Sequence, residues 1–164
     1  MNIEIIKTDI TLLKIDAIIN AANNAMCGGG GVDGAIHRKA GRELLTECRT
    51  LKGCKTGKAK LTKGYNLPAK YIIHTVGPVW YGGHKNEEFL LTSCYQECLK
   101  IADTNGFKVI AFPAISCGAY RFPINKACDI AIKEVYNFKS TVLDKVIFSC
   151  FDTKIERALT KSLS

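Results

Sequence analysis

Residues 16–34 read DAIINAANNAMCGGGGVDG, and this stretch carries the clearest structural signal in the chain. A short run of small and β-branched apolar residues ends at Asn20, two more asparagines follow, and then come four consecutive glycines, Gly28 to Gly31. The apolar run is typical of a buried strand, and glycines without a Cβ let a ligand reach the backbone. The stretch therefore predicts a strand, a ligand-accessible loop and, from about Asp33, a helix that continues at four-residue spacing with Ile36, Ala40, Leu44 and Cys48.

Outside this stretch, apolar runs and amphipathic segments alternate along the chain. Strands are expected at Ile3 to Lys7, Asp16 to Asn20, Tyr71 to Val76, Lys108 to Phe112 and Lys145 to Cys150. Helices are expected at Glu87 to Asp103, at Asn125 to Phe138 and after a cap at Asp152 or Thr153, with Gly41 as a candidate break in the helix after the glycines. This alternation predicts a largely parallel sheet with helices on both faces, an α/β/α sandwich. Such sheets bind ligands at the carboxyl ends of their strands.

Length and composition favour one cytoplasmic domain over residues 1–164. The chain has 164 residues, 47% of them hydrophobic, which suits a single core. Its first residues lack the pattern of a secretory signal, and no apolar run approaches the roughly 20 residues that span a bilayer. The eight cysteines are scattered without paired short spacings, so we expect free thiols, with Cys94 and Cys98 buried on a helix.

The formal net charge of +8 favours an anionic partner. A nucleotide and a nucleic acid both satisfy that condition, but none of the common nucleic-acid motifs is present, so nucleic acid is not expected. An RNA-binding module would rest on the charge alone. The lysines at positions 52, 55, 58, 60 and 63 are interpreted as a solvated face.

The first glycine-rich loop is predicted to hold an anion. Its glycines expose backbone N–H groups, and the helix that follows points its positive amino end at whatever they bind. A merely flexible turn is the alternative, but it would need neither the preceding asparagines nor Asp33. The loop matches neither G-x-G-x-x-G in a dinucleotide-binding context nor G-x-x-x-x-G-K-[ST].

A second loop, Pro113 to Pro123, follows the strand that ends at Phe112. Its small residues again expose N–H groups, and a helix starts near Pro123. Two anion-receptive loops on one sheet edge suit a pyrophosphate. Tyr120 is interpreted equally well as a ligand platform or a core residue, whereas Phe122 is expected to pack.

The sequence resembles the macrodomain family, in particular its MacroD-like branch of ADP-ribosyl-acceptor hydrolases. The matching stretches run in the family's order: Thr8 to Thr11, Asp16 to Asn23, Gly28 to Gly34 with Ile36 to Arg38 and Ala40-Gly41, Tyr71 to Trp80, and Phe112 to Pro123. The resemblance implies a three-layer α/β/α fold with a mixed, mainly parallel sheet and a cleft for ADP-ribose.

The resemblance also implies roles for individual residues. Asn23 and Asp33 match the family's catalytic pair at the distal ribose. The implied substrate-binding residues are Asp9, Ile10, Phe151 and Asp152 at the adenine end, Asn20, and Gly30, Gly31, Val32, Ser116, Cys117, Gly118, Ala119 and Tyr120 along the diphosphate. The implied reactions are hydrolysis of mono-ADP-ribosyl esters on acidic side chains and deacetylation of O-acetyl-ADP-ribose. The alternative is a non-catalytic ADP-ribose reader, which would need neither Asn23 nor Asp33.

The role of Asp33 and the specificity for the acceptor each allow more than one interpretation. A carboxylate beside an amide can position and deprotonate a water, but Asp33 as a helix cap would be a weak base. In that case the pyrophosphate of the substrate activates the water and Asp33 orients it. Arg121 and Cys117 stand where members of the family commonly carry glycine and threonine, and these departures bear on acceptor specificity. A nucleophilic Cys117 is disfavoured, because neither His37 nor His74 can be placed beside it.

No metal site and no cofactor are expected. The three histidines are dispersed, and Cys27 with His37 lacks a convincing ligand set. We interpret His74 as a hydrogen-bonded structural residue and His37 as a helix residue or a neighbour of the site. The expected partners are ADP-ribose with an ADP-ribosylated protein or O-acetyl-ADP-ribose, without a membrane, and the protein is expected to be a monomer.

Overall fold

A six-stranded mixed sheet forms the centre of the computed structural model, which describes residues 1–164. The strand order is β1-β6-β5-β2-β4-β3, and only β3 runs antiparallel to its neighbour. The strands are β1 (Asn2–Lys7), β2 (Ala17–Ala21), β3 (Ala59–Lys63), β4 (Tyr71–Thr75), β5 (Val109–Phe112) and β6 (Lys145–Cys150).

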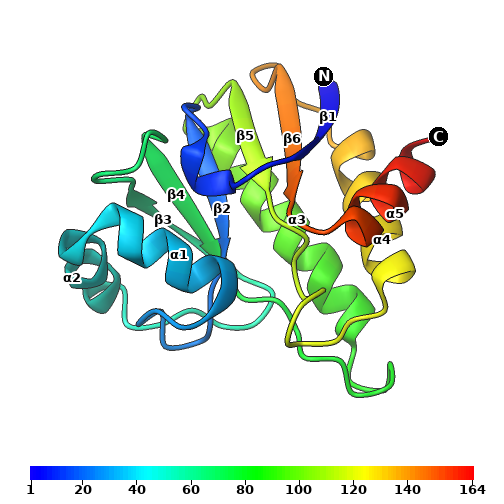
Figure 1. Cartoon of the computed structure of the whole chain (residues 1–164), viewed down its shortest axis with the longest axis horizontal. Helices are drawn as coiled ribbons and strands as arrows, with labels where there is room; N and C mark the ends of the chain where they lie inside the picture. Colours follow the sequence, from blue (N-terminus) through cyan, green and yellow to red (C-terminus); the bar gives the residue numbers. More distant parts are fainter.

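Helices cover both faces of this sheet (Figure 1). One face carries the 3₁₀ helix η1 (Ile10–Leu12), α1 (Gly31–Ala40) and α2 (Arg42–Thr50). The other face carries α3 (Glu87–Thr104), α4 (Ile124–Asn137) and α5 (Thr153–Leu163). The expected α/β/α sandwich with a mixed, mainly parallel sheet is confirmed. No helix combines the length and the apolar composition needed to cross a bilayer.

The sequence located most of these elements and missed one. The five expected strands and the two long helices agree with the structure to within one residue at each end, and Asp152 caps α5 by accepting from the backbone N–H of Lys154 at 2.7 Å. The missed strand is β3, which includes two lysines of the supposed solvated face. Lys60 contradicts that interpretation: it is half-buried, and its ammonium donates to the backbone carbonyls of Leu51 and Gly53.

The helix after the glycines also differs in its limits. It begins at Gly31, two residues before Asp33, and breaks at Gly41, whose φ of 93° lies in the region that favours glycine. The chain then continues as α2. Asp33 consequently lies inside the first turn of α1 instead of capping it, and the capping alternative is wrong.

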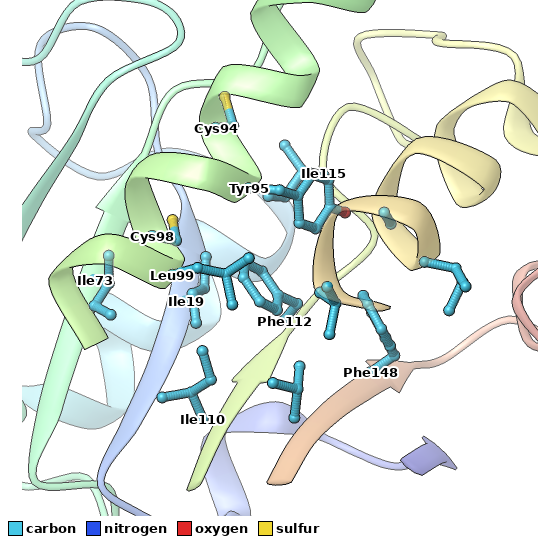
Figure 2. Close-up of a cluster of buried hydrophobic side chains, with 14 of the residues drawn as sticks. Ile19, Ile73, Cys94, Tyr95, Cys98, Leu99, Ile110, Phe112, Ile115 and Phe148 are labelled. Atoms are coloured by element: carbon cyan, nitrogen blue, oxygen red, sulfur yellow. The ribbon is translucent and has the colours of Figure 1, made fainter. Parts of the chain in front are cut away.

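Two apolar clusters hold the helical layers onto the sheet. The larger one packs α3, α4 and α5 on the sheet, with the ring of Phe112 between those of Tyr95 and Phe148 at centroid distances of 4.9 and 5.8 Å (Figure 2). Cys94 and Cys98 are fully buried in it, as expected, and all eight cysteines are free thiols. The smaller cluster lies beneath α1 and α2.

The neighbouring strands β2 and β5 set the position of the two glycine-rich loops. They pair in parallel, so both end at the same edge of the sheet. The chain after β2 goes on to β3 and β4 on one side, whereas the chain after β5 goes through α4 to β6 on the other. Connections that diverge in this way leave a crevice between the two strands, the usual ligand position in such sheets.

The chain between β4 and α3 folds around one buried carboxylate. Glu87, the first residue of α3, is 1% exposed and accepts backbone N–H bonds from Tyr81, Gly83 and Lys85 at 2.6 to 2.9 Å. Burial opposes ionisation, but these bonds outweigh it and lower the pKa of Glu87 to about 2. Ionised Glu87 therefore fixes this turn.

Because the folded pKa is depressed, Glu87 contributes stability fully above about pH 4.5 and loses it as the pH falls toward about 2. We expect Glu87→Gln to lower the Tm at pH 7, with the difference from the wild type narrowing over that acid range. Thermal melts at several pH values measure this. A difference that does not depend on pH would contradict the assignment.

Candidate functional site

A cavity of about 380 Å³ lies at the carboxyl ends of β2 and β5. Its walls come from three places along the chain. One wall is Ala21 to Asn23 with Gly29 to Asp33, the opposite wall is Pro113 to Ser116 with Gly118 to Tyr120, and Gly77 after β4 closes it. The two glycine-rich loops thus face each other across one cavity.

Asparagine side chains hold the first loop in shape. The amide oxygen of Asn23 accepts from Met26 N at 2.9 Å, and its Nδ2 donates to the carbonyl of Gly28 at 3.1 Å. Asn24 Nδ2 donates to the carbonyl of Cys54 at 3.0 Å. These bonds give the loop a defined conformation, as expected if the asparagines have a structural purpose.

The amino end of α1 points unpaired N–H groups at the cavity. Gly30 caps the helix without a side-chain bond, and the N–H groups of Gly31 and Val32 donate to no acceptor in the chain. The turn is tight, since a Cβ on Gly34 would come within 2.4 Å of the carbonyl oxygen of Gly29. Free N–H groups and the positive helix end together favour an anion here.

The second loop offers a matching set of donors. Ser116 adopts a left-handed φ of 66°, which its hydroxyl supports by donating to the Pro78 carbonyl at 2.8 Å. The N–H groups of Gly118, Ala119 and Tyr120 have no acceptor in the chain. Gly77 lies against this loop, where a Cβ would collide with Ser116 Oγ and Ile115 Cγ2, so any larger residue would force these two side chains to move.

Asp33 is the one carboxylate in the cavity wall. It is 5% exposed, and its Oδ1 accepts from Asn20 Nδ2 at 2.8 Å while His37 Nε2 lies 3.4 Å from the same oxygen. The other oxygen, Oδ2, turns toward Gly29, on the side where Asn23 Nδ2 also lies. One oxygen is thus held by the protein, and the other is left for a ligand or a water.

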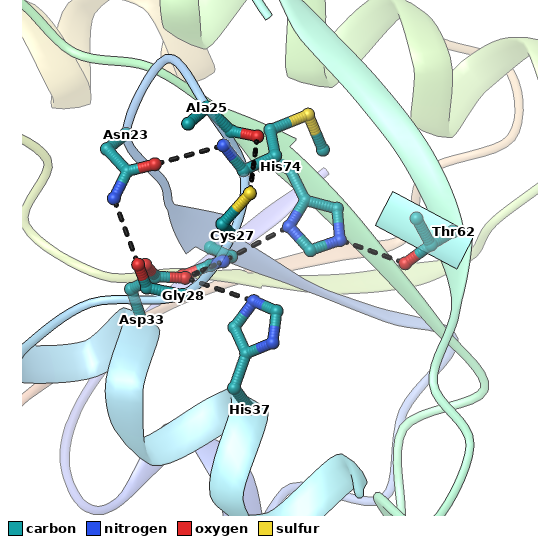
Figure 3. A network of polar contacts seen from close by, with 10 residues as sticks. Asn23, Ala25, Cys27, Gly28, Asp33, His37, Thr62 and His74 are labelled. Carbon is teal, nitrogen blue, oxygen red and sulfur yellow. Dashed lines mark hydrogen bonds and ion pairs between the residues drawn. The ribbon is translucent and has the colours of Figure 1, made fainter. Parts of the chain in front are cut away.

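A chain of buried polar groups continues behind Asp33 (Figure 3). Asn20 Nδ2 also lies 3.1 Å from His74 Nδ1, and His74 Nε2 lies 2.9 Å from Thr62 Oγ1. Burial, with a smaller effect of nearby His37, lowers the pKa of His74 to about 3, so the ring is neutral. Thr62 donates its own proton to the Lys63 carbonyl, so it accepts from Nε2–H, and Nδ1 accepts from Asn20.

Within this series of hydrogen bonds, Asn20 lies behind the cavity wall and not in it. Asn20 is fully buried, does not line the cavity, and both protons of its Nδ2 are engaged, while its Oδ1 has no partner. Its contacts make it a positioning residue for Asp33. The interpretation of His74 as a hydrogen-bonded structural residue is confirmed.

The comparisons with known proteins agree with this geometry. Residues 19–131 match the family model of the Macro domain. The chain belongs to the macro domain family. A "Macro domain-containing protein" of Methanosarcina mazei is 54% identical over 99% of this chain and 88% of its own length. An "O-acetyl-ADP-ribose deacetylase" of Escherichia fergusonii is 47% identical over 99% of this chain and 95% of its own.

Solved structures also place this chain in the macro domain family. The Trypanosoma brucei macrodomain, crystallised in complex with ADP-ribose, superposes on this macro domain with a TM-score of 0.94. It is 43% identical, over 99% of this chain and 69% of that one.

Cys117 of this macro domain does not face the cavity. Its neighbours in the loop line the wall, but its side chain packs against the core cluster that contains Cys128. A hydrogen bond from the Cys128 thiol lowers the pKa of Cys117, although burial opposes the shift. Its N–H makes a long 3.4 Å bond to the Ala114 carbonyl. The inward position argues against a nucleophilic role.

The aromatic and basic residues of the second loop occupy three different environments: the cavity wall, the core and the exposed surface. Tyr120 lines the cavity, and its carbonyl accepts from Trp80 N at 2.8 Å. Phe122 is buried against Trp80 at a centroid distance of 4.8 Å, so its expected packing is confirmed. Arg121 has a left-handed φ of 60°, a conformation that glycine adopts more readily than arginine, and its exposed side chain is outside the cavity wall.

The residues expected at an adenine end lie at the same sheet edge but outside this cavity. Asp9 follows β1 and Phe151 follows β6, the strand paired with β1 in parallel. A hydrogen bond from the Thr11 hydroxyl lowers the pKa of Asp9, burial opposes this, and the Thr11 N–H adds to it. Ile10 has its side chain buried in the smaller core cluster, whereas Phe151 is 62% exposed and Asp152 caps α5.

Sequence reasoning missed Thr62 and Gly77. Thr62 belongs to the overlooked strand β3, and its contact with His74 depends on the pairing of β3 with β4. Gly77 follows the predicted strand directly, so a glycine at a strand's carboxyl end was an available signal. No group of three or more His, Cys, Asp or Glu side chains could hold a metal ion.

The buried chain behind Asp33 predicts one protonation state for His74. Because its pKa is lowered to about 3, the folded protein should keep His74 neutral, with the proton on Nε2, from pH 8 to about pH 5. The unfolded chain takes up this proton below about pH 6.5, so stability falls as the pH drops from there toward 3. Two-dimensional ¹⁵N NMR of the imidazole nitrogens measures the tautomer. A proton bound to His74 Nδ1 at neutral pH would overturn the hydrogen-bond directions.

Proposed function

We propose that this protein binds ADP-ribose between the two loops and hydrolyses esters at its distal ribose. The proposed substrates are O-acetyl-ADP-ribose and mono-ADP-ribosyl esters of acidic side chains. One observation carries the proposal: Asp33 is held through Oδ1 by Asn20 and presents Oδ2 beside Asn23 and Gly29, in a wall otherwise rich in free N–H groups.

The two walls of the cavity support a diphosphate as the ligand. The free N–H groups of Gly31 and Val32 and those of Gly118 to Tyr120 come from opposite loops, so each set can bind one phosphate. Tyr120 lies on the same wall and gives a ribose an aromatic surface. The adenine then extends toward Asp9, Ile10, Phe151 and Asp152 at the ends of β1 and β6.

The proposed reaction consumes one water. The oxygen of that water bonds to the acyl carbon, the bond from that carbon to the ribose oxygen breaks, and a proton passes to the ribose oxygen. ADP-ribose and a carboxylic acid are released. Asp33 Oδ2 accepts a hydrogen bond from the water and aims it, with Asn23 beside it. The helix end and the free N–H groups stabilise negative charge nearby.

The names of relatives support the same reaction. Proteins of Escherichia fergusonii and Enterobacter cloacae, each 47% identical to this chain over nearly its full length, are named O-acetyl-ADP-ribose deacetylase. The E. fergusonii protein aligns over 99% of this chain, which includes both loops.

Asp33 variants separate catalysis from binding. Asp33→Ala and the isosteric Asp33→Asn should each reduce kcat about 100-fold or more, since both remove the carboxylate that aims the water. The Kd for ADP-ribose should stay within a few-fold of wild type, because the phosphate-binding N–H groups remain. Release of ADP-ribose from glutamate-linked and O-acetyl substrates measures the rate, and calorimetry measures binding.

Two results would contradict this proposal. Full activity of the Asp33→Asn protein would remove the assigned role. Tight ADP-ribose binding by the wild type without turnover of either ester would identify a reader instead of a hydrolase.

A further inference from the structure

A second concave surface lies between the start of α4 and the exposed face of α5. It encloses about 260 Å³ and is lined by Asn125, Thr153, Lys154, Arg157, Ala158 and Lys161. Three of these six side chains are cations, two are neutral hydrogen-bonding groups, and none is a carboxylate. We name this surface the α5 groove.

The cations of the α5 groove are gathered by helical geometry. Lys154, Arg157 and Lys161 are spaced at i, i+3 and i+7, so they share one face of α5 over two turns, and all three are exposed. Like charges at such spacings repel each other. Lys7 adds a further cation at the rim, where its Nζ donates to Thr153 Oγ1 at 2.7 Å.

The cations of this groove form no ion pair with a carboxylate. No carboxylate lies within 4.0 Å of the charged nitrogens of Lys154, Arg157 or Lys161, although the chain forms such ion pairs at Lys126 with Glu88 and at Lys145 with Glu4. Asp152 accepts the backbone N–H of Lys154, and Asp129 accepts the hydroxyl of Ser162. Three unpaired cations around one concavity fit an anionic group, and the planar Arg157 fits a phosphate in particular.

The position of the groove connects it with the nucleotide. Helix α5 begins directly after Phe151 and Asp152, and α4 begins directly after the second loop. Under the proposed function, the adenosine half of ADP-ribose ends beside those two residues. An anion attached to the adenosine would therefore extend toward the α5 groove.

We propose that the α5 groove binds a phosphate attached to the adenosine of the ligand, beyond the pyrophosphate held by the loops. This rests on the proposed placement of ADP-ribose in the main cavity. Such a phosphate has two sources: a phosphate ester on the adenosine ribose, or the pyrophosphate of a second ADP-ribose unit linked there. Lys154, Arg157 and Lys161 supply the charge, and Asn125 and Thr153 supply neutral hydrogen bonds.

Calorimetry with three ligands tests this directly: ADP-ribose, ADP-ribose 2′-phosphate and an ADP-ribose dimer. The wild type should bind at least one of the phosphate-extended ligands about tenfold more tightly than ADP-ribose, the worth of one charge-assisted hydrogen bond. The ligand with the gain identifies the source. The gain should shrink with added salt, since the cations are exposed.

Two triple variants that each remove three positive charges test whether the gain in affinity for the phosphate-extended ligand comes from the α5 groove. The triple variant Lys154→Gln, Arg157→Gln and Lys161→Gln should lose the gain and keep its affinity for ADP-ribose. The control triple variant Lys52→Gln, Lys55→Gln and Lys63→Gln removes the same charge from exposed side chains near β3, at the opposite edge of the sheet. It should keep the gain.

The outcomes separate this inference from the proposed function. Equal wild-type affinity for all three ligands would overturn the groove and leave the ADP-ribose site intact. Equal loss in both triple variants would also overturn it, because the gain would then be an effect of net charge. Failure to bind ADP-ribose at all would remove the proposed function and this inference with it.

Discussion

The bond from Asn20 Nδ2 to Asp33 Oδ1, 2.8 Å long and fully buried, ties the first turn of α1 to the end of β2. The glycine-rich loop lies between these two residues, so this bond closes it at its base. It also fixes which carboxylate oxygen faces the cavity. Leaving a buried amide or carboxylate without its partner costs about 1 to 3 kcal/mol. The bond that shapes the site therefore also contributes to the free energy of unfolding. His74 and Thr62 extend this constraint from β2 to β4 and β3.

Much of the fold was predictable from local patterns. The β-branched runs and the four-residue spacing placed five strands and two long helices, because each buries one face or both. Strand β3 was missed because Lys60 and Lys63 interrupt its apolar pattern at an edge of the sheet. The start of α1 was placed late because Gly31, a weak helix former, opens it, whereas Asp33 resembles a cap. The pairing of the Asp33 carboxylate with Asn20 of β2 places Asp33 inside the helix, and local sequence preferences carry no information about that contact.

The site itself was only partly predictable. The loops and Asp33 were visible as residue types at strand ends, but their orientations depend on contacts between distant parts of the chain. Asn20 and His74 are 54 positions apart, and their contact follows from the register that pairs Asn20 with His74 across β2 and β4. Cys117 stands among residues that line the wall, yet its side chain turns into the core. The direction of a side chain in such a loop depends on the backbone conformation, which the residue type alone does not determine.

The proposed hydrolysis requires that Asp33 face the distal ribose of an ADP-ribose bound between the two loops. The most direct test is a crystal structure of the protein with ADP-ribose. We expect the diphosphate within hydrogen-bonding distance of the N–H groups of Val32 and Ala119, with the distal ribose beside Asp33 Oδ2. Adenine beside Asp33, or a diphosphate away from both loops, would contradict it.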